Sequence, residues 1–382
     1  MVRSQVEATR GSIDFAVAAL PATEILAAGV LSGALNELSR YTRGSGYRTL
    51  GTPPLRRAIA REITRWGLPT SAEQLIVTSG VQQAINLAAA LLVHRGETVV
   101  VEDPTYVSAI DIFAAAGARL STVPCGREGV RVDALEGVIA REAPTLVFLV
   151  PTFHNPTGTL LPSHQRKEVA ELAERYRVPV VEDAALADLG FAAEPPAPLA
   201  AFHSDAPVFT VGSLSKLFWG GLRIGWMRAP RHIIAQLERA KLVMDHGSSI
   251  PSQVLALRLF EHVDEIRDAR RKLLAERCEL LCELVAGQLP SWSFEPPLGG
   301  LSLWVELPYG SATDLARVAQ RHGVAIAPGP VYSASNSFDD HLRIPFVQPT
   351  EILREGVARL ARAWHEYHPP GPVRSTRMTT VV

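Results

Sequence analysis

The chain has 382 residues, of which 47% are hydrophobic and 20% charged, and its formal net charge is −1. This length favours two domains or one elaborated α/β domain, and the near-neutral charge excludes a general attraction to nucleic acid or to anionic membranes. The N-terminal residues are polar, and no apolar run approaches the ~20 residues that span a bilayer, so we expect a cytoplasmic protein.

The first two thirds of the chain predict helices that alternate with short apolar strands. Residues 55–66 have apolar residues at helical spacing, and a strand in "EQLIVTSG" is followed by a helix from Val81. Further strands are expected in "ETVVVEDPTY", "RLSTVPC", "TLVFLVPT", "VPVVEDAAL" and "PVFTVGS", with helices in "VSAIDIFAAAGA", "VDALEGVIARE" and "QRKEVAELAERYR". Apolar strands between helices indicate a mainly parallel sheet in a three-layer α/β/α domain.

The pattern changes after about residue 255. One long charged helix, "VDEIRDARRKLLAERCELLCELVAG", has an arginine-rich face that we expect to be solvated. A smaller α+β unit follows, with strands in "LGGLSLWVELP" and "HLRIPFV". We expect a large domain over 46–260, a small domain over 261–368 and a poorly ordered tail over 369–382.

Three cysteines, Cys125, Cys278 and Cys282, occur without CxxC or HExxH spacing. We therefore expect ordinary thiols and no metal site.

Polar or reactive residues stand at the ends of the predicted strands. In a sheet of this kind, ligands bind at the carboxyl ends of the strands. Any one of these residues could be a cap or a turn residue, but the whole set predicts one binding site. The set comprises Ser79, Gly80, Tyr106, Asn155, Asp183, Ser213, Ser215 and Lys216.

One part of this set suits a phosphate group. Free backbone N–H groups at the start of a helix attract anions, and hydroxyl groups and a guanidinium add donors. Considered alone, Arg223 could equally be a surface residue that forms an ion pair. The phosphate ligands predicted in this way are Gly80, Val81, Gln82, Ser213, Ser215 and Arg223.

Lys216 is one of only four lysines in the chain. A lysine desolvated near other cations has a lowered pKa and can form an imine with an aldehyde. An aldehyde, a phosphate and a conjugated ring together describe pyridoxal 5′-phosphate. Asp183 would then pair with the pyridinium nitrogen, Tyr106 would stack on the ring, and Asn155 would donate to its phenolic oxygen.

The stretch "SLSKLFWGGLRIGW" resembles the lysine motif of fold-type I pyridoxal-phosphate enzymes of the class I/II aminotransferase family. Four further stretches before it, "TSGVQQAINL", "VEDPTY", "HNPTG" and "VVEDAALADL", occur in that family's order. The similarity runs from about residue 14 to about residue 364. The Phe-Trp-Gly-Gly stretch is most similar to the aminotransferase-like half of MocR-type regulators. The resemblance implies a homodimer with active sites at the subunit interface. It also implies that an N-terminal segment, here 1–45, joins the small domain.

By this resemblance, the family's lysine and aspartate correspond to Lys216 and Asp183. Its asparagine, stacking aromatic and phosphate arginine correspond to Asn155, Tyr106 and Arg223. It adds Arg343, in "HLRIPF", as the residue that binds the substrate carboxylate, and Tyr47 as a residue that reaches the partner subunit's phosphate. Two departures stand out. Leu186 occupies a place where many members have a tyrosine, and Ala18 and Ala19 occur where a glycine before proline is usual.

The resemblance implies an enzyme that acts on an α-amino acid through an external aldimine, most simply an aminotransferase in which Lys216 moves the proton. The same residues can serve decarboxylation, oxidative deamination or β-elimination, for example on a cysteine conjugate in specialised metabolism. A non-catalytic effector-binding module is a third alternative. MocR-type regulators carry a DNA-binding domain before their aminotransferase-like half. In this sequence the first feature of the aminotransferase-like part appears by about residue 14, so we expect no nucleic-acid partner.

Overall fold

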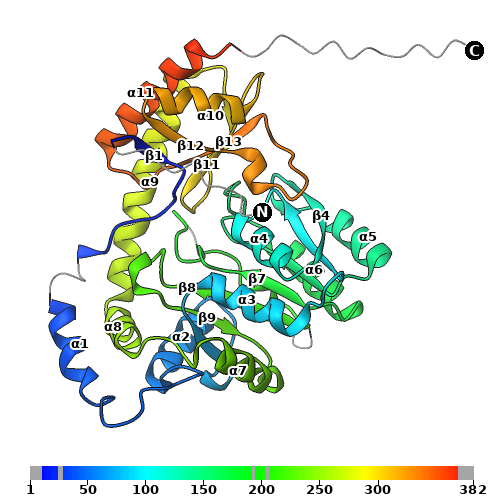
Figure 1. Cartoon of the computed structure of the whole chain (residues 1–382), viewed down its shortest axis with the longest axis vertical. Coiled ribbons are helices and arrows are strands. Elements are labelled where there is room, and N and C mark those ends of the chain that lie inside the picture. Colours follow the sequence, from blue (N-terminus) through cyan, green and yellow to red (C-terminus); the bar gives the residue numbers. More distant parts are fainter. Residues whose placement is uncertain (1–10, 25–28, 192–193, 204–205, 369–382) are drawn as a thin grey trace, which may run out of the picture.

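The computed structural model describes residues 11–24, 29–191, 194–203 and 206–368 (Figure 1). The tail predicted to be poorly ordered, 369–382, lies outside the described residues. Within the described part, the strands form one sheet of eight and one of five. No helix in that part is long and apolar enough to cross a membrane.

The larger sheet has the strand order β2-β9-β8-β7-β6-β3-β4-β5. Strands β3, β4, β6, β7 and β8 run parallel, whereas β9 is antiparallel to both neighbours and β5 is antiparallel to β4. The prediction of a mainly parallel sheet is therefore confirmed. Its strands are β2 (Leu75–Thr78), β3 (Thr98–Asp103), β4 (Arg119–Gly126), β5 (Gly129–Val130), β6 (Leu146–Leu149), β7 (Val180–Asp183), β8 (Val208–Ser213) and β9 (Gly225–Arg228).

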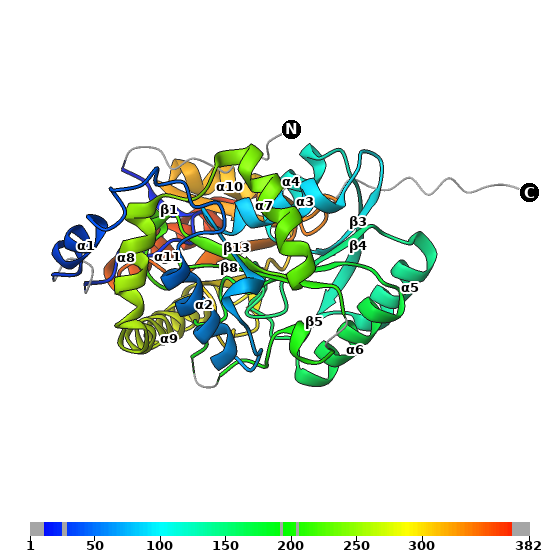
Figure 2. The same ribbon diagram turned by 90° about the horizontal axis from the view of Figure 1, so that it is seen from below.

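Helices cover both faces of this sheet, as the continuous apolar strands predict (Figure 2). On strand β3, Val99 and Val101 pack toward one helical layer and Val100 toward the other. The first layer contains α3 (Val81–Leu92), α4 (Val107–Ala115) and α7 (Arg231–Asp245), and the second contains α2 (Pro53–Arg65), α5 (Val132–Glu142) and α6 (Ser163–Arg175). The expected three-layer α/β/α arrangement is confirmed.

The smaller sheet joins a segment near the start of the described chain to segments from its last third. Strand β1 pairs in parallel with β12, and the full order is β1-β12-β13-β11-β10. These strands are β1 (Ile13–Phe15), β10 (Ser293–Phe294), β11 (Ser302–Glu306), β12 (Val324–Pro328) and β13 (His341–Pro345), with helices α10 (Ala312–Arg321) and α11 (Thr350–Glu366) against them. The domain limits given above stay a prediction.

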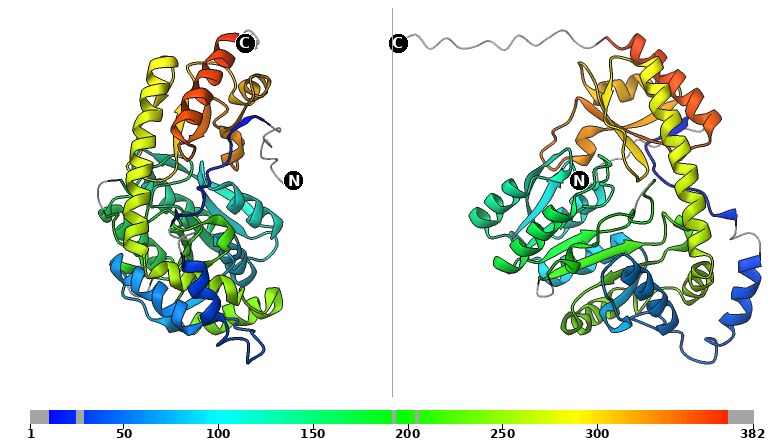
Figure 3. Two further views of the ribbon diagram at one scale, coloured as in Figure 1. Left: turned by 90° about the vertical axis from the view of Figure 1, so that its left-hand side faces the viewer. Right: turned by 180° about the vertical axis from the view of Figure 1, so that it is seen from behind.

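Two further helices, α1 (Leu31–Leu38) and α8 (Ile250–Phe260), pack together, and α9 (Val263–Gln288) runs alongside both sheets (Figure 3). The expectation of a solvated arginine face on α9 is wrong at two positions. Arg267 is buried in ion pairs with Asp188 and Glu62 at 2.8 and 2.6 Å. Arg270 is buried and donates to the Leu217 carbonyl at 3.1 Å. These partners lie far away in the sequence, so the charge pattern of the helix cannot reveal them.

Several predicted strands end earlier than expected, and two of these ends shape the site. Strand β3 ends at Asp103 because Pro104 has no N–H to continue the ladder. Strand β7 ends at Asp183, whose carboxylate accepts the backbone N–H of Ala185 at 2.8 Å and turns the chain. The residues after these strands therefore lie in loops at the carboxyl edge of the sheet.

Candidate active site

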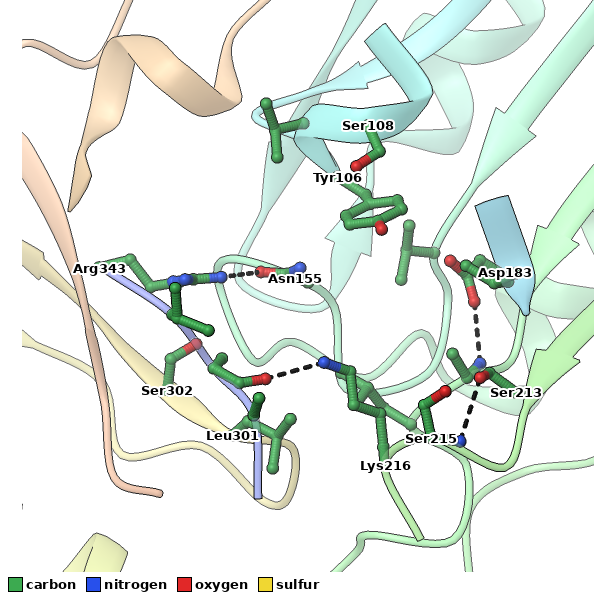
Figure 4. Close-up of a pocket in the computed structure, with 18 of the residues that line it drawn as sticks. Tyr106, Ser108, Asn155, Asp183, Ser213, Ser215, Lys216, Leu301, Ser302 and Arg343 are labelled. Atoms are coloured by element: carbon green, nitrogen blue, oxygen red, sulfur yellow. Dashed lines mark hydrogen bonds between the residues drawn. The ribbon is translucent and has the colours of Figure 1, made fainter. Parts of the chain in front are cut away.

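A cavity of about 360 Å³ opens at the carboxyl edge of the larger sheet, facing the smaller sheet. This volume is typical of a small-molecule site. Tyr47 and Ser79 do not line it. All the other residues predicted for the site do, as Figure 4 shows for several of them: Gly80, Val81, Gln82, Tyr106, Asn155, Asp183, Ser213, Ser215, Lys216, Arg223 and Arg343.

The first helical turn of α3 forms one end of the cavity. Gly80 precedes this helix with φ of +124°, and the N–H groups that follow it have no intrahelical acceptors. Arg223, itself in the left-handed region at φ 52°, packs so closely that a Cβ on Gly80 would lie 3.3 Å from its Nη2. Among the described residues, no carboxylate pairs with Arg223. An unpaired guanidinium beside free backbone donors is suited to a phosphate group.

Strand β9, which was not predicted from the sequence, brings these groups together. Gly225 lies opposite both Thr78 of β2 and Ser213 of β8 in the sheet. A Cβ on Gly225 would lie 2.7 Å from the Gly80 backbone, so only glycine permits this approach. Arg223 is positioned because it closely precedes this tightly packed strand.

The two serines complete the same end of the cavity. Ser213 is the last residue of β8, and its Oγ accepts the backbone N–H of Ser215 at 3.1 Å. This bond turns the chain so that both residues line the cavity, next to Lys216 (Figure 4).

Lys216 lies between Asp183 and Arg343 (Figure 4), and the charges of these two residues act in opposite directions on its pKa. Burial, helped by the positive charge of Arg343 and opposed by Asp183, lowers the pKa of Lys216 to about 8. Its Nζ donates to the carbonyl oxygen of Ala18 at 2.8 Å. The amine is therefore much nearer to its neutral, nucleophilic form at pH 7 than an exposed lysine is.

Asp183 is a buried carboxyl group that faces the cavity. Burial raises its pKa to about 6; the Ala185 N–H and the charge of Lys216 act against this rise, and Glu182 and Glu102 add to it. A cationic partner in the cavity would stabilise the carboxylate, since a buried anion without a cation is costly. A protonated ring nitrogen would be such a partner.

Tyr106 and Gln82 line the adjoining wall. Gln82 donates from Nε2 to the Ser108 hydroxyl at 2.9 Å and, more weakly, to the Tyr106 hydroxyl at 3.4 Å. Burial raises the pKa of Tyr106, although the hydrogen bonds with Ser108 and Gln82 act against this rise, so the phenol stays neutral. Ser108 was not predicted from the sequence, because only its place on α4, two residues after Tyr106, brings it to Gln82.

Arg343 is held from three sides. Its Nη1 donates to Asn155 Oδ1 at 3.1 Å, its Nη2 donates to the Ala16 carbonyl, and its guanidinium lies 5.0 Å from the centre of the Tyr332 ring. Its buried Nε has no hydrogen-bond partner in the part of the chain that the structure describes. Because arginine can only donate, it must face the Asn155 oxygen, which leaves the Asn155 amide N–H₂ to serve as a donor toward the cavity.

Leu186 also lines the cavity and is only 8% exposed. It supplies an apolar surface where the resemblance leads us to expect a phenolic hydroxyl. Tyr332, a further lining residue, was missed because no motif marks it; its contact with Arg343 exists only in the folded chain.

Tyr47 lies outside the cavity. Its side chain is 70% exposed, and its ring centroid is 5.5 Å from that of His246. A contact with the phosphate of a partner subunit therefore stays a prediction.

Glu102, Cys125 and His154 place donor atoms within 4.8 Å of one another. The His154 Nε2 is 3.4 Å from Glu102 Oε2, and its Nδ1 is 2.8 Å from the Thr157 hydroxyl. These contacts describe a buried histidine–carboxylate pair, and the expectation that the site holds no metal stays a prediction.

The residues present fit pyridoxal phosphate at each of its functional groups. Arg223 and the α3 N-terminus suit the phosphate, the buried Asp183 suits the ring nitrogen, and the Lys216 amine suits the aldehyde.

Comparison with known proteins agrees with this fit. The family model described as "Aminotransferase class I and II" matches residues 14–360. The chain is 32% identical to Aromatic-amino-acid aminotransferase 1 of Thermococcus litoralis, over 83% of this chain and 79% of that protein. It is 29% identical to YdfD, an uncharacterized HTH-type transcriptional regulator of Bacillus subtilis, over 88% of this chain and 71% of that protein.

Among solved structures, LysN, the alpha-aminoadipate aminotransferase of Thermus thermophilus, superposes with a TM-score of 0.88 at 30% identity. The match covers 95% of each chain, and that crystal contains N-(5′-phosphopyridoxyl)-L-leucine.

Proposed function

Because this chain belongs to the aminotransferase class I and II family and is a pyridoxal-phosphate-dependent transaminase, we propose that its amino donor is an α-amino acid bound between Arg343 and Lys216. The observation that carries this proposal is the shared cavity. Lys216 and Arg343 both line one cavity of about 360 Å³, and each donates a hydrogen bond to the Ala16–Ala18 backbone. Arg343 would bind the α-carboxylate, and the substrate amine would lie toward Lys216.

When bound, pyridoxal phosphate supplies an aldehyde that condenses with amines and a ring that withdraws electrons from the substrate Cα. The phosphate would be held by the Gly80 turn, Ser213, Ser215 and Arg223. Asp183 would hold the proton on the ring nitrogen, the Asn155 amide would donate to the phenolic oxygen, and Tyr106 would cover one face of the ring.

Lys216 is the group best placed to move the substrate proton. Its pKa of about 8 would let Nζ accept a proton from the substrate Cα and pass it on within the same turnover near neutral pH. The Ala18 carbonyl, which accepts a hydrogen bond from Nζ at 2.8 Å, would orient the amine between these events.

We also propose that the active form is a homodimer. An exposed apolar surface surrounds the C-terminal end of α7, where Leu242, Val243 and Met244 are 44%, 89% and 44% exposed. Tyr47 lies beside it, against His246 of the following turn. Apolar clusters of this kind mark interaction surfaces, and a second copy docked there would bring Tyr47 toward the other subunit's site.

One observation favours a different reaction on the same substrate class. Leu186 leaves the phenolic oxygen of the cofactor with one donor fewer than the resemblance leads us to expect, which would change the electron demand of the ring. Decarboxylation, oxidative deamination or β-elimination is therefore the second candidate.

One experiment separates these candidates. The purified holoenzyme is incubated with a panel of amino acids, with and without 2-oxo acids, and the products are identified by mass spectrometry. Transamination predicts that a new oxo acid and a new amino acid accumulate beyond the amount of enzyme only when an acceptor is present. Both products should be lost in Lys216→Ala but not in the exposed-lysine control Lys167→Ala. Carbon dioxide or ammonia formed without an acceptor would count against transamination and support the second candidate.

A further inference from the structure

One of the four lysines in this arginine-rich chain is fully buried outside the cavity: Lys241 on α7. Its Nζ donates to both carboxylate oxygens of Asp245, at 2.9 and 2.8 Å, and to Gln83 Oε1 at 2.9 Å. All three ammonium hydrogens therefore have an acceptor.

Gln83 connects this lysine to the phosphate end of the cavity. It lies in the first turn of α3, and its side chain bends back so that Oε1 also accepts the backbone N–H of Ser79 at 2.9 Å. Its Nε2 donates to Asp245 Oδ2 at 2.6 Å. Ser79 directly precedes Gly80, so the chain of contacts runs from Lys241 through Gln83 to the turn that faces the cavity.

The charges leave the Gln83 amide only one favourable orientation. An ammonium group can only donate and a carboxylate can only accept, so the amide oxygen must face Lys241 and the amide nitrogen must face Asp245. Burial lowers the pKa of Lys241, and the hydrogen bond and charge of Asp245 act against this change. The pair is neutral overall, so it does not compete with an anion for the donors of the turn.

Lysine suits this position better than arginine does. The three acceptors, Asp245 Oδ1, Asp245 Oδ2 and Gln83 Oε1, converge on one point. A single ammonium nitrogen can serve all three, whereas the donors of a guanidinium diverge in a planar fork.

We propose that Lys241 is a positioning residue for the cofactor phosphate, acting through Gln83 on the Ser79–Gly80 turn, a role that rests on the proposed use of this turn for phosphate binding. Gln83 occupies the Ser79 N–H and holds the turn so that the N–H groups after it point at the phosphate. When Lys241 is lost, Gln83 can rotate and the turn can relax.

The test compares the cofactor with its analogue that lacks the phosphate. Binding of pyridoxal phosphate and of pyridoxal to the cofactor-free protein is measured by fluorescence for wild type, Lys241→Met and the exposed-lysine control Lys167→Met. In Lys241→Met we expect the preference for pyridoxal phosphate over pyridoxal to fall about tenfold or more, the worth of a buried hydrogen bond to a charged group. Pyridoxal affinity should stay within about twofold, because no contact of the ring changes.

A second variant covers the case in which Lys241→Met does not fold. Asp245→Asn keeps the shape of the site but removes the charge that orients Lys241, and it should lower the same preference. If a folded variant keeps the wild-type preference, or loses affinity for both ligands equally, the positioning role is wrong. If wild-type protein itself fails to prefer pyridoxal phosphate, the proposed phosphate site is wrong, and the positioning role of Lys241 is wrong with it.

Discussion

Lys216 and Arg343 donate hydrogen bonds to the same short piece of backbone, Lys216 to the Ala18 carbonyl at 2.8 Å and Arg343 to the Ala16 carbonyl. The segment that follows β1 thus lies against both groups proposed to contact the substrate (Figure 4). The positive charge of Arg343 also lowers the pKa of Lys216. If Arg343 binds the substrate carboxylate as proposed, substrate binding would therefore change the pKa of Lys216.

Replacing Arg343 with leucine should remove the carboxylate contact. We expect kcat/KM for amino acids to fall about 100-fold, the worth of a charge-assisted bidentate contact, with the larger effect on KM. Steady-state kinetics of the complete reaction, with a fixed saturating 2-oxo acid, measures this, with Arg317→Leu, a 72% exposed arginine, as the control. An unchanged KM would rule out Arg343 as the carboxylate ligand.

Asp183 should make the cofactor-free protein less stable as the pH rises. Its folded pKa of about 6 lies above the ordinary value of 3.8, so the cost of the buried charge is absent below 3.8 and fully present above about 6. Asp183→Asn should raise the free energy of unfolding at pH 7 by about 2–3 kcal/mol while weakening cofactor binding. Urea unfolding at pH 7 and below 3.8 tests this; an equal effect at both would contradict the assignment.

Capture of pyridoxal phosphate by the cofactor-free protein should depend on the protonation of Lys216. The amine reacts only when neutral, so the rate should rise with pH through a midpoint near 8. Arg343→Leu should move this midpoint upward, because the charge that lowers the pKa is gone. Stopped-flow absorbance gives the midpoint, and a value near that of free lysine in wild type would contradict the burial of this amine.

Leu186→Tyr should restore a donor toward the phenolic oxygen of the cofactor. We expect the visible absorption band of the lysine-bound cofactor to titrate at lower pH than in wild type, since the new hydrogen bond stabilises the phenolate. Leu186→Phe is the matched control because it adds the ring without the hydroxyl. Equal shifts in both variants would attribute the change to packing.

Gly225→Ala should disturb the phosphate end without touching a ligand. The added Cβ would lie 2.7 Å from the Gly80 backbone and 2.7 Å from the Gly212 carbonyl oxygen. We expect a loss of about 1–3 kcal/mol in the free energy of unfolding and weaker cofactor binding. Gly137→Ala, on a helix where a Cβ meets nothing within 4 Å, is the control. A fully stable Gly225→Ala protein would contradict the close packing of β9.

Val243→Asp should weaken the proposed dimer, because it places a charge in the centre of the apolar surface. Sedimentation would then show a shift toward monomer, while Leu298→Asp, at another apolar residue that is 66% exposed, should leave the dimer intact. A wild-type protein that is monomeric at micromolar concentration would refute the proposed dimer itself.

The alternation of helices and strands between residues 55 and 213 and the identity of the cofactor could be predicted from local patterns. The strands that precede Gly80 and Lys216 are mainly apolar runs, and the lysine, aspartate and asparagine occur in recognisable motifs. These features depend on residues a few positions apart, so they are visible in the sequence. Strand β9 was missed because its first residues, Gly225 and Trp226, belong to the lysine motif and it is recognised as a strand only by its pairing with β2 and β8.

The contacts that align the site could not be predicted, because they join residues that are far apart in the chain. Arg343 meets Asn155 across 188 positions, and Lys216 meets Ala18 across 198. Local periodicity carries no information about such pairs; they exist only once β1 joins the C-terminal strands and β9 enters the larger sheet. The sequence by itself therefore determined which chemical groups this protein carries, and the tertiary structure decided which of them share one cavity, since only packing between distant segments sets their distances and pKa values.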